Sequence, residues 1–127
     1  MDQTLNIAGK KVTFRKTGAT MLQYQRQTGR EFFKDLSAFL DVLDKDEDGN
    51  YMDIKDISQS KALEIMTVSS FNYMYDMLFV MAKAADPSIP ADMLEWLEGF
   101  GDFPVLQIFI TLLPMIVAEM TMNPKNV

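Results

Sequence analysis

The chain begins with an alternation of apolar and polar residues that is typical of β-strands. Leu5 and Ile7 share one face, as Val12 and Phe14 do, and a glycine between the two runs suits a tight turn. The pattern predicts a β-hairpin over residues 3–16. Because a lone hairpin is marginally stable in water, we expect this one to pack against helices or to pair with another chain.

After the hairpin, apolar residues recur every three or four positions, which predicts helices. Thr20 and Gln23 form a capping-box pair that opens a short helix, and Gly29 suits its C-terminal stop. The predicted helices cover about residues 20–28, 30–43, 57–85 and 89–99, with a last helix that starts at Asp102 and Pro104 and is kinked by Pro114.

Two of these helices have distinctive apolar faces. The helix over 30–43 has one stripe, and the helix over 57–85 has two, so we expect the latter to be covered on more than one side and to lie centrally. The inner face predicted for the helix over 89–99 contains Met93, Leu94, Trp96 and Leu97. The single stripe consists of Phe32, Phe33, Leu36, Phe39, Leu40 and Leu43.

The elements together predict a mainly α fold, a single helical domain of about five helices preceded by a short N-terminal β-hairpin. One domain is what a chain of 127 residues allows. We expect the helical body to cover residues 18–121, with an exposed acidic loop at 44–56 and a frayed tail at 122–127.

The last predicted helix contains the longest apolar run, residues 105–118. It is shorter than the roughly 20 apolar residues of a bilayer-spanning helix, so we expect a buried helix or an interaction surface. Large apolar surfaces often mark binding sites, which also favours self-association. The candidate partner-binding residues are Val105, Leu106, Phe109, Leu112, Leu113 and Ile116.

Composition narrows the possible functions. The chain has no histidine and no cysteine, which excludes disulfides, imidazole bases and thiolate or imidazole metal ligands. It also lacks a glycine-rich phosphate loop, and its carboxylate pairs, such as Glu95 and Glu98, are predicted on a solvated helix face. We therefore expect no enzyme activity, no cofactor and no metal site. The 11 methionines are either core filler or an adaptable binding face.

Charge is unevenly distributed along the chain. The net charge is −6, which argues against a nucleic-acid partner, yet residues 9–34 carry a net +6 and residues 35–60 a net −6. This is either an ordinary solvated surface or a basic end that docks on an acidic end of another copy or steers a partner.

The acidic loop offers a second functional class. Asp44, Asp46, Asp48 and Gly49 match the first half of an EF-hand calcium loop, but Lys55 stands where a bidentate Glu is required. A solvated loop is the alternative. A calcium-responsive binding module would give heat and a thermal shift in calorimetry with millimolar calcium.

Several segments, taken in order, resemble the tail assembly chaperones of siphoviruses and prophages of Gram-positive bacteria. They are VTFRKTG at 12–18, YQRQTGREF at 24–32, FKDL at 33–36, YDMLFVMAKAA at 75–85 and EWLEGF at 95–100. The likeness covers nearly the whole chain, and order and spacing make it more specific than any one segment. The family pattern does not require the extended acidic stretch at 44–53.

The resemblance implies a function. Such chaperones coat the long, helical, aggregation-prone tape measure protein in the host bacterial cytoplasm and help the tail tube protein to polymerise around it. They are absent from the mature virion. From the residues themselves, as argued above, we expect a homo-oligomer, no membrane and no nucleic-acid partner. A minor structural tail or connector protein is the alternative, which mass spectrometry of purified virions would distinguish.

The resemblance also raises the possibility of two products that share an N-terminus. Lys125 and Asn126 can be encoded within a slippery run, A-AAA-AAC, at which a −1 ribosomal frameshift would append a second domain. The longer form would then be a further partner. The codons at these positions and an overlapping open frame in the gene test this hypothesis.

Overall fold

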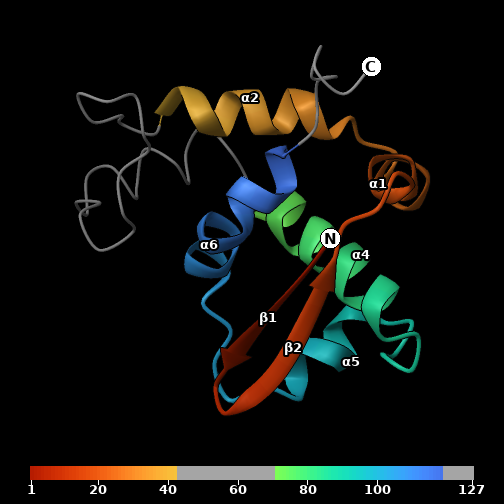
Figure 1. The fold of residues 1–127 in the computed structure, drawn as a ribbon, viewed down its shortest axis with the longest axis vertical. Coiled ribbons are helices and arrows are strands. Elements are labelled where there is room, and N and C mark those ends of the chain that lie inside the picture. The colour runs from red at the N-terminus through yellow and green to blue at the C-terminus, as the bar shows by residue number, and fades with distance from the viewer. Residues whose placement is uncertain (43–70, 119–127) are drawn as a thin grey trace.

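A computed structural model describes residues 1–42 and 71–118 of the chain, with side chains described as far as residue 37 in the first segment (Figure 1). The predictions for the loop at 44–56, the first part of the helix at 57–85 and the tail at 122–127 lie outside these residues. So do the EF-hand-like positions and the frameshift site.

The N-terminal hairpin is present as expected. Strand β1 (Asp2–Ile7) pairs antiparallel with β2 (Lys10–Arg15), with Leu5 opposite Val12. Ala8 and Gly9 form the turn with φ of 50° and 85°. Two positive φ values define a type I′ turn, whose twist matches that of the flanking strands.

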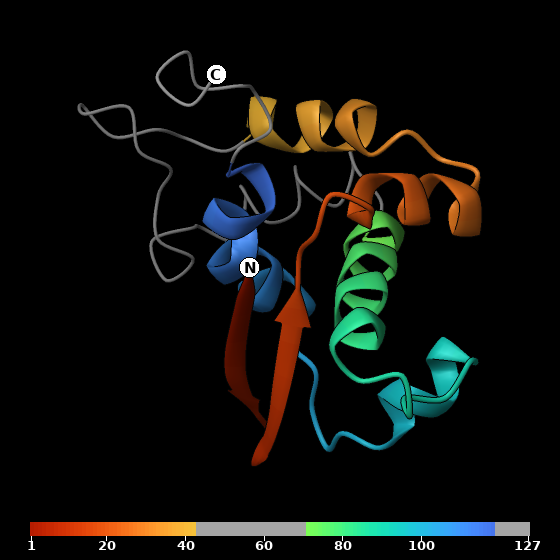
Figure 2. The ribbon, with the colours of Figure 1, turned by 45° about the vertical axis from the view of Figure 1, so that its right-hand side comes forward.

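The helices confirm the mainly α fold class. They are α1 (Thr20–Thr28), α2 (Phe32–Val42), α4 (Asn72–Ala85), α5 (Met93–Glu98) and α6 (Val105–Val117). Strand β2 lies between β1 and α4, and α2 crosses one end of the molecule while α5 lies at the other (Figures 1 and 2).

Helix α4 is the central element, as its two apolar stripes predict. It packs against β2, α1 and α6, so apolar side chains are required all around it. Three methionines of this helix are fully buried and fill the space between these neighbours. The buried residues of α4 are Tyr73, Met74, Met77, Leu78, Phe79, Val80, Met81 and Ala82.

The start of α1 differs from the prediction. Ala19 is the residue before the helix and makes no side-chain cap, so Thr20 and Gln23 form no capping box. The Thr20 side chain is buried, and its hydroxyl accepts a hydrogen bond from the Thr17 amide at 2.9 Å. The hydroxyl of this buried side chain therefore bonds to the segment before α1 and does not cap the free amides of the first turn of α1. Gly29 ends the helix in the left-handed conformation, with φ of 72°, as expected.

Two predicted inward-facing side chains point to solvent instead. Phe33 is 56% exposed and Leu94 is 68% exposed. Helix α5 begins only at Met93, because the Asp92 carboxylate accepts from the Leu94 amide at 3.1 Å and starts the helix there. Trp96 is the buried residue of α5.

Helix α6 begins one residue after Pro104, which therefore precedes the helix instead of lying in its first turn. Pro114 lies inside α6 and is exposed. The C-terminal end of this helix is joined to the hairpin, because the Lys16 ammonium donates a hydrogen bond to the Ala118 carbonyl.

Candidate partner-binding surface

The structure places the predicted contact face of α6 in the hydrophobic core. Val105, Phe109, Leu112, Leu113 and Ile116 are buried, and Leu106 is partly buried against the same cluster. The face that the sequence offers to a partner is therefore covered by the chain itself.

Phe109 illustrates how this face is covered. Its side chain is fully buried, with its ring 5.7 Å from that of Tyr73 in an edge-on arrangement and 6.4 Å from that of Phe32. These contacts join α6 to α4 and to α2. The large apolar run of α6 is explained by this packing, which the sequence pattern alone could not distinguish from a binding surface.

The outer face of α6 is mostly polar or weakly apolar. Gln107, Thr111 and Pro114 are exposed, and the Thr111 hydroxyl donates to the Gln107 carbonyl at 2.7 Å. Val117 is the large apolar side chain exposed on this helix. The outer face thus offers little apolar area to a partner.

Among the described residues, the other large apolar side chains that are exposed lie on different elements. Met1 precedes β1, Leu22 is on α1, Phe33 on α2 and Leu94 on α5. Helices α2 and α5 lie at opposite ends of the molecule, so Phe33 and Leu94 do not belong to one patch (Figure 1). Apolar residues scattered in this way are normal on a protein surface.

A cleft lies where β2, the end of α4 and α5 meet, and we name it the hairpin cleft. Its volume is about 310 Å³. It combines apolar side chains of the core edge with two lysines of the hairpin. The lining residues are Lys10, Lys11, Val12, Thr13, Ala85, Asp86, Ile89, Trp96 and Phe100.

Aromatic packing fixes the apolar side of the hairpin cleft. The Trp96 ring packs edge-on against Phe100 at 5.4 Å and contacts Phe79 of α4 at 5.6 Å. The Lys10 ammonium lies 5.4 Å from the centre of the Phe100 ring and donates to the Gly99 carbonyl. Lys10 is exposed but held by these contacts, and Lys11 is the second exposed lysine of the lining.

A polar cluster joins α1, α2 and α4 on another side of the molecule. The Tyr24 hydroxyl donates to Asp35 at 3.3 Å, and Arg30 pairs with Asp76 at 3.5 Å. Burial raises the pKa of Asp76, although Arg30 opposes the shift, and burial with the Asp35 charge raises the pKa of Tyr24. These groups hold three helices together, and the shifts follow from burial at that junction.

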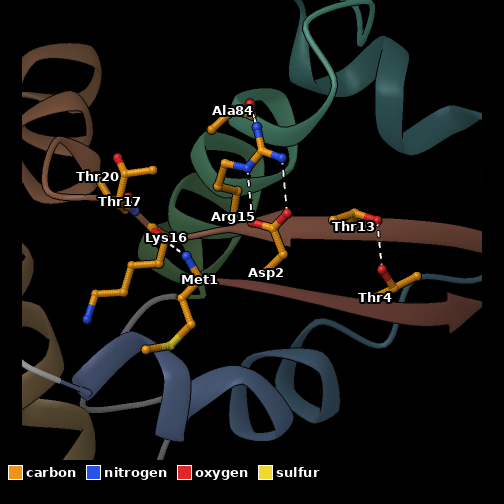
Figure 3. Close-up of polar contacts among 9 residues, drawn as sticks. All are labelled: Met1, Asp2, Thr4, Thr13, Arg15, Lys16, Thr17, Thr20 and Ala84. Atoms are coloured by element: carbon orange, nitrogen blue, oxygen red, sulfur yellow. Dashed lines mark hydrogen bonds and ion pairs between the residues drawn. The ribbon is translucent and has the colours of Figure 1, made fainter.

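The outer face of the hairpin is polar and closely paired (Figure 3). Arg15 donates to both Asp2 oxygens, at 2.9 and 3.0 Å, which lowers the pKa of that exposed carboxyl. The Thr4 and Thr13 hydroxyls are 2.8 Å apart. The N-terminal ammonium donates to the Lys16 carbonyl at 2.9 Å, so the hairpin is closed at both ends.

Within residues 1–42 and 71–118, no three carboxylates gather closely enough to hold a metal ion. Among the helices described, none has the length and apolar character to cross a membrane. A scan against protein-family models finds no match to this chain, and neither curated proteins nor solved structures match it.

Proposed function

We propose that this chain is a phage tail assembly chaperone that binds the tape measure protein and keeps it soluble while the tail tube forms. The proposal is supported by the sequence segments that resemble this family and that follow one another in the same order along the chain. An acidic chain of net charge −6 without histidine or cysteine is compatible with a binding role. On this proposal the protein acts in the host bacterial cytoplasm and is absent from the finished virion.

The hairpin cleft is the contact site that we favour over the α6 face. Its lining includes the partly buried Ile89 and Phe100 next to an exposed lysine, whereas the α6 residues are buried apart from the partly buried Leu106. An amphipathic helix can place an apolar side chain against Ile89 and Phe100 and an acidic side chain near Lys11. This arrangement of the cleft is the single observation in favour of helix binding at this site.

Co-expression tests the function. The partner is the product of the long downstream gene that encodes a coiled-coil protein, and we expect it to stay soluble and to co-purify with this chain. If it aggregates equally with and without this chain, the chaperone proposal is wrong. Detection of the chain in purified virions would favour the structural tail or connector protein instead.

A matched pair of variants tests the site. Lys11→Glu reverses the charge at the opening of the hairpin cleft, and Lys34→Glu makes the same change on α2, where the side chain is also exposed. We expect Lys11→Glu to weaken co-purification, with Lys34→Glu close to wild type. Equal effects would mean that net charge matters and the cleft does not.

A further inference from the structure

The two-stranded sheet leaves one edge of β1 open. Met1 and Lys16 exchange two backbone hydrogen bonds, of 2.8 and 2.9 Å. This pair determines which of the following residue pairs in the hairpin are hydrogen-bonded and which are not. With this register, the backbone groups of Gln3, Leu5 and Ile7 point toward β2. The backbone groups of the intervening β1 residues point away from it, and none of them has another backbone partner among the described residues.

Among the described residues, this edge has few of the features that keep other edges from pairing. Natural edge strands are protected by lysines, prolines, bulges or a covering element. Strand β2 has Lys11 and Arg15 along its own free edge and packs against α4. Strand β1 contains neither a basic residue nor a proline, and it lies on the side of β2 away from α4 (Figure 2).

We propose that β1 pairs antiparallel with β1 of a second copy of this chain, with Thr4 facing Thr4 across a twofold axis. The two hairpins then form a continuous four-stranded sheet. The outward-facing residues of each β1 become hydrogen-bonded pairs, and each pair exchanges two backbone hydrogen bonds. An isologous contact of this kind closes on itself as a dimer.

Charges on the polar face favour this pairing. Asp2 already pairs with Arg15 in its own hairpin, and Asn6 lies opposite Lys11. Centring on Thr4 places Asp2 opposite Asn6 of the second copy. Each outer row of the sheet then runs Arg15, Asp2, Asn6 and Lys11 from one edge to the other, so that no two like charges are adjacent.

The middle row of the sheet consists of threonines. Thr13 and Thr4 already share a hydrogen bond of 2.8 Å between their hydroxyls. The pairing extends this row to Thr13, Thr4, Thr4 and Thr13 across the two copies. Hydroxyl pairs of this kind stabilise antiparallel strands and tolerate either donor direction.

The inner face of the sheet also fits. Leu5 is only partly buried within one chain, although it packs against the core cluster. The pairing places Leu5 next to Gln3 of the second copy, whose side chain covers part of its remaining exposed area. Other registers are less favourable, because pairing that is centred on Asp2 brings two carboxylates together and shortens the overlap.

Single cysteines test the register directly, because the chain has no cysteine of its own. In Thr4→Cys the two Cα atoms are expected about 5.5 Å apart, within the range of a disulfide. In Asn6→Cys the two copies of the residue are separated by about 14 Å along the strands. With a mild oxidant we expect the Thr4 variant to form a covalent dimer and the Asn6 variant to stay monomeric.

A mixture of two different single-cysteine variants provides a second test of the same register. Asp2→Cys mixed with Asn6→Cys should give a mixed disulfide, while Asn6→Cys alone gives none. If Thr4→Cys and Asn6→Cys form dimers equally, the reaction is collisional and the pairing is refuted. If Thr4→Cys stays monomeric under the same oxidant, the register centred on Thr4 is refuted.

Proline variants provide a readout without oxidation. Thr4→Pro removes an outward-facing N–H of β1, and Thr13→Pro makes the same change at the free edge of β2. Both lose the shared hydroxyl bond, although Thr13 is partly buried and Thr4 is exposed. By light scattering at increasing concentration we expect wild type and Thr13→Pro to approach twice the monomer mass and Thr4→Pro to remain monomeric.

Circular dichroism of the two proline variants controls for loss of fold. A monomeric wild-type chain at high concentration would overturn the proposal, as would a dimer that survives Thr4→Pro. The experiments use this chain alone and do not depend on a tape measure protein. Failure of the dimer and failure of the proposed chaperone function can therefore be told apart.

Discussion

Phe109 provides the sharpest test of how α6 is used. Its side chain is fully buried and packs against the rings of Phe32 and Tyr73. Truncation of a buried Phe to Ala costs about 3–5 kcal/mol, from lost transfer free energy and the cavity left behind. Because a domain of this kind is stable by only about 5–15 kcal/mol, Phe109→Ala should remove a large part of its stability.

Urea unfolding followed by circular dichroism at 222 nm measures this loss. For a slope of roughly 2 kcal/mol per molar, a 4 kcal/mol loss lowers the midpoint by about 2 M. Leu94→Ala is the control, because that side chain is 68% exposed and its truncation should cost less than about 0.5 kcal/mol.

A charged substitution at Phe109 distinguishes a core residue from a residue of a contact surface. On the sequence pattern alone, Phe109→Asp abolishes partner binding and leaves the helices intact. In the structure this change places a carboxylate in the core, so we now expect it to unfold the chain. A Phe109→Asp protein with wild-type helicity and midpoint but no partner binding would refute our assignment of this residue to the core.

Three further changes have defined outcomes. Ala8 has φ of 50° in the hairpin turn, a conformation in which Asn is favoured over Ala. Ala8→Asn should therefore raise the free energy of unfolding by about 1 kcal/mol. A lower urea midpoint would contradict the turn geometry. Gly29→Ala should lower the free energy of unfolding by about 1 kcal/mol, because φ is 72° at this position. Gly18→Ala meets no atom within 4 Å and should be nearly neutral. Equal losses in the two variants would refute the conformational argument. The raised pKa of Asp76 means that the folded chain holds this proton more tightly, so stability should fall as pH rises from 3.8 through the folded pKa. Urea midpoints across this range should fall less in Asp76→Asn, and an unchanged pH slope would show that the carboxyl is not perturbed.

Much of the fold could be predicted from local patterns. The hairpin followed from strand alternation around Gly9, and the central position of α4 followed from its two apolar stripes. The first turn of α1 could not be predicted in the same way. A threonine before a helix suits a cap, and only its burial shows that Thr20 turns its hydroxyl toward Thr17 instead.

The candidate site was harder to predict for a physical reason. An apolar helix face has the same sequence pattern whether its own chain or another chain covers it. Phe109 was expected to meet a partner and instead meets two helices of its own chain. The hairpin cleft combines lysines near residue 10 with rings near residue 100, and no local spacing indicates that these segments are adjacent.

The packing of β2 and α1 on α4 has a consequence for synthesis on the ribosome. Residues 1–42 contain the hairpin and two helices, but the helix that covers their apolar faces starts only at Asn72. A nascent chain that ends before that point lacks the helix on which β2 and α1 pack, and these two elements contain Phe14 and Tyr24, both fully buried in the finished fold. The contacts of β2 and α1 with α4 therefore form only after a long segment of chain has closed, and loop closure of this kind slows folding and prolongs exposure to proteases.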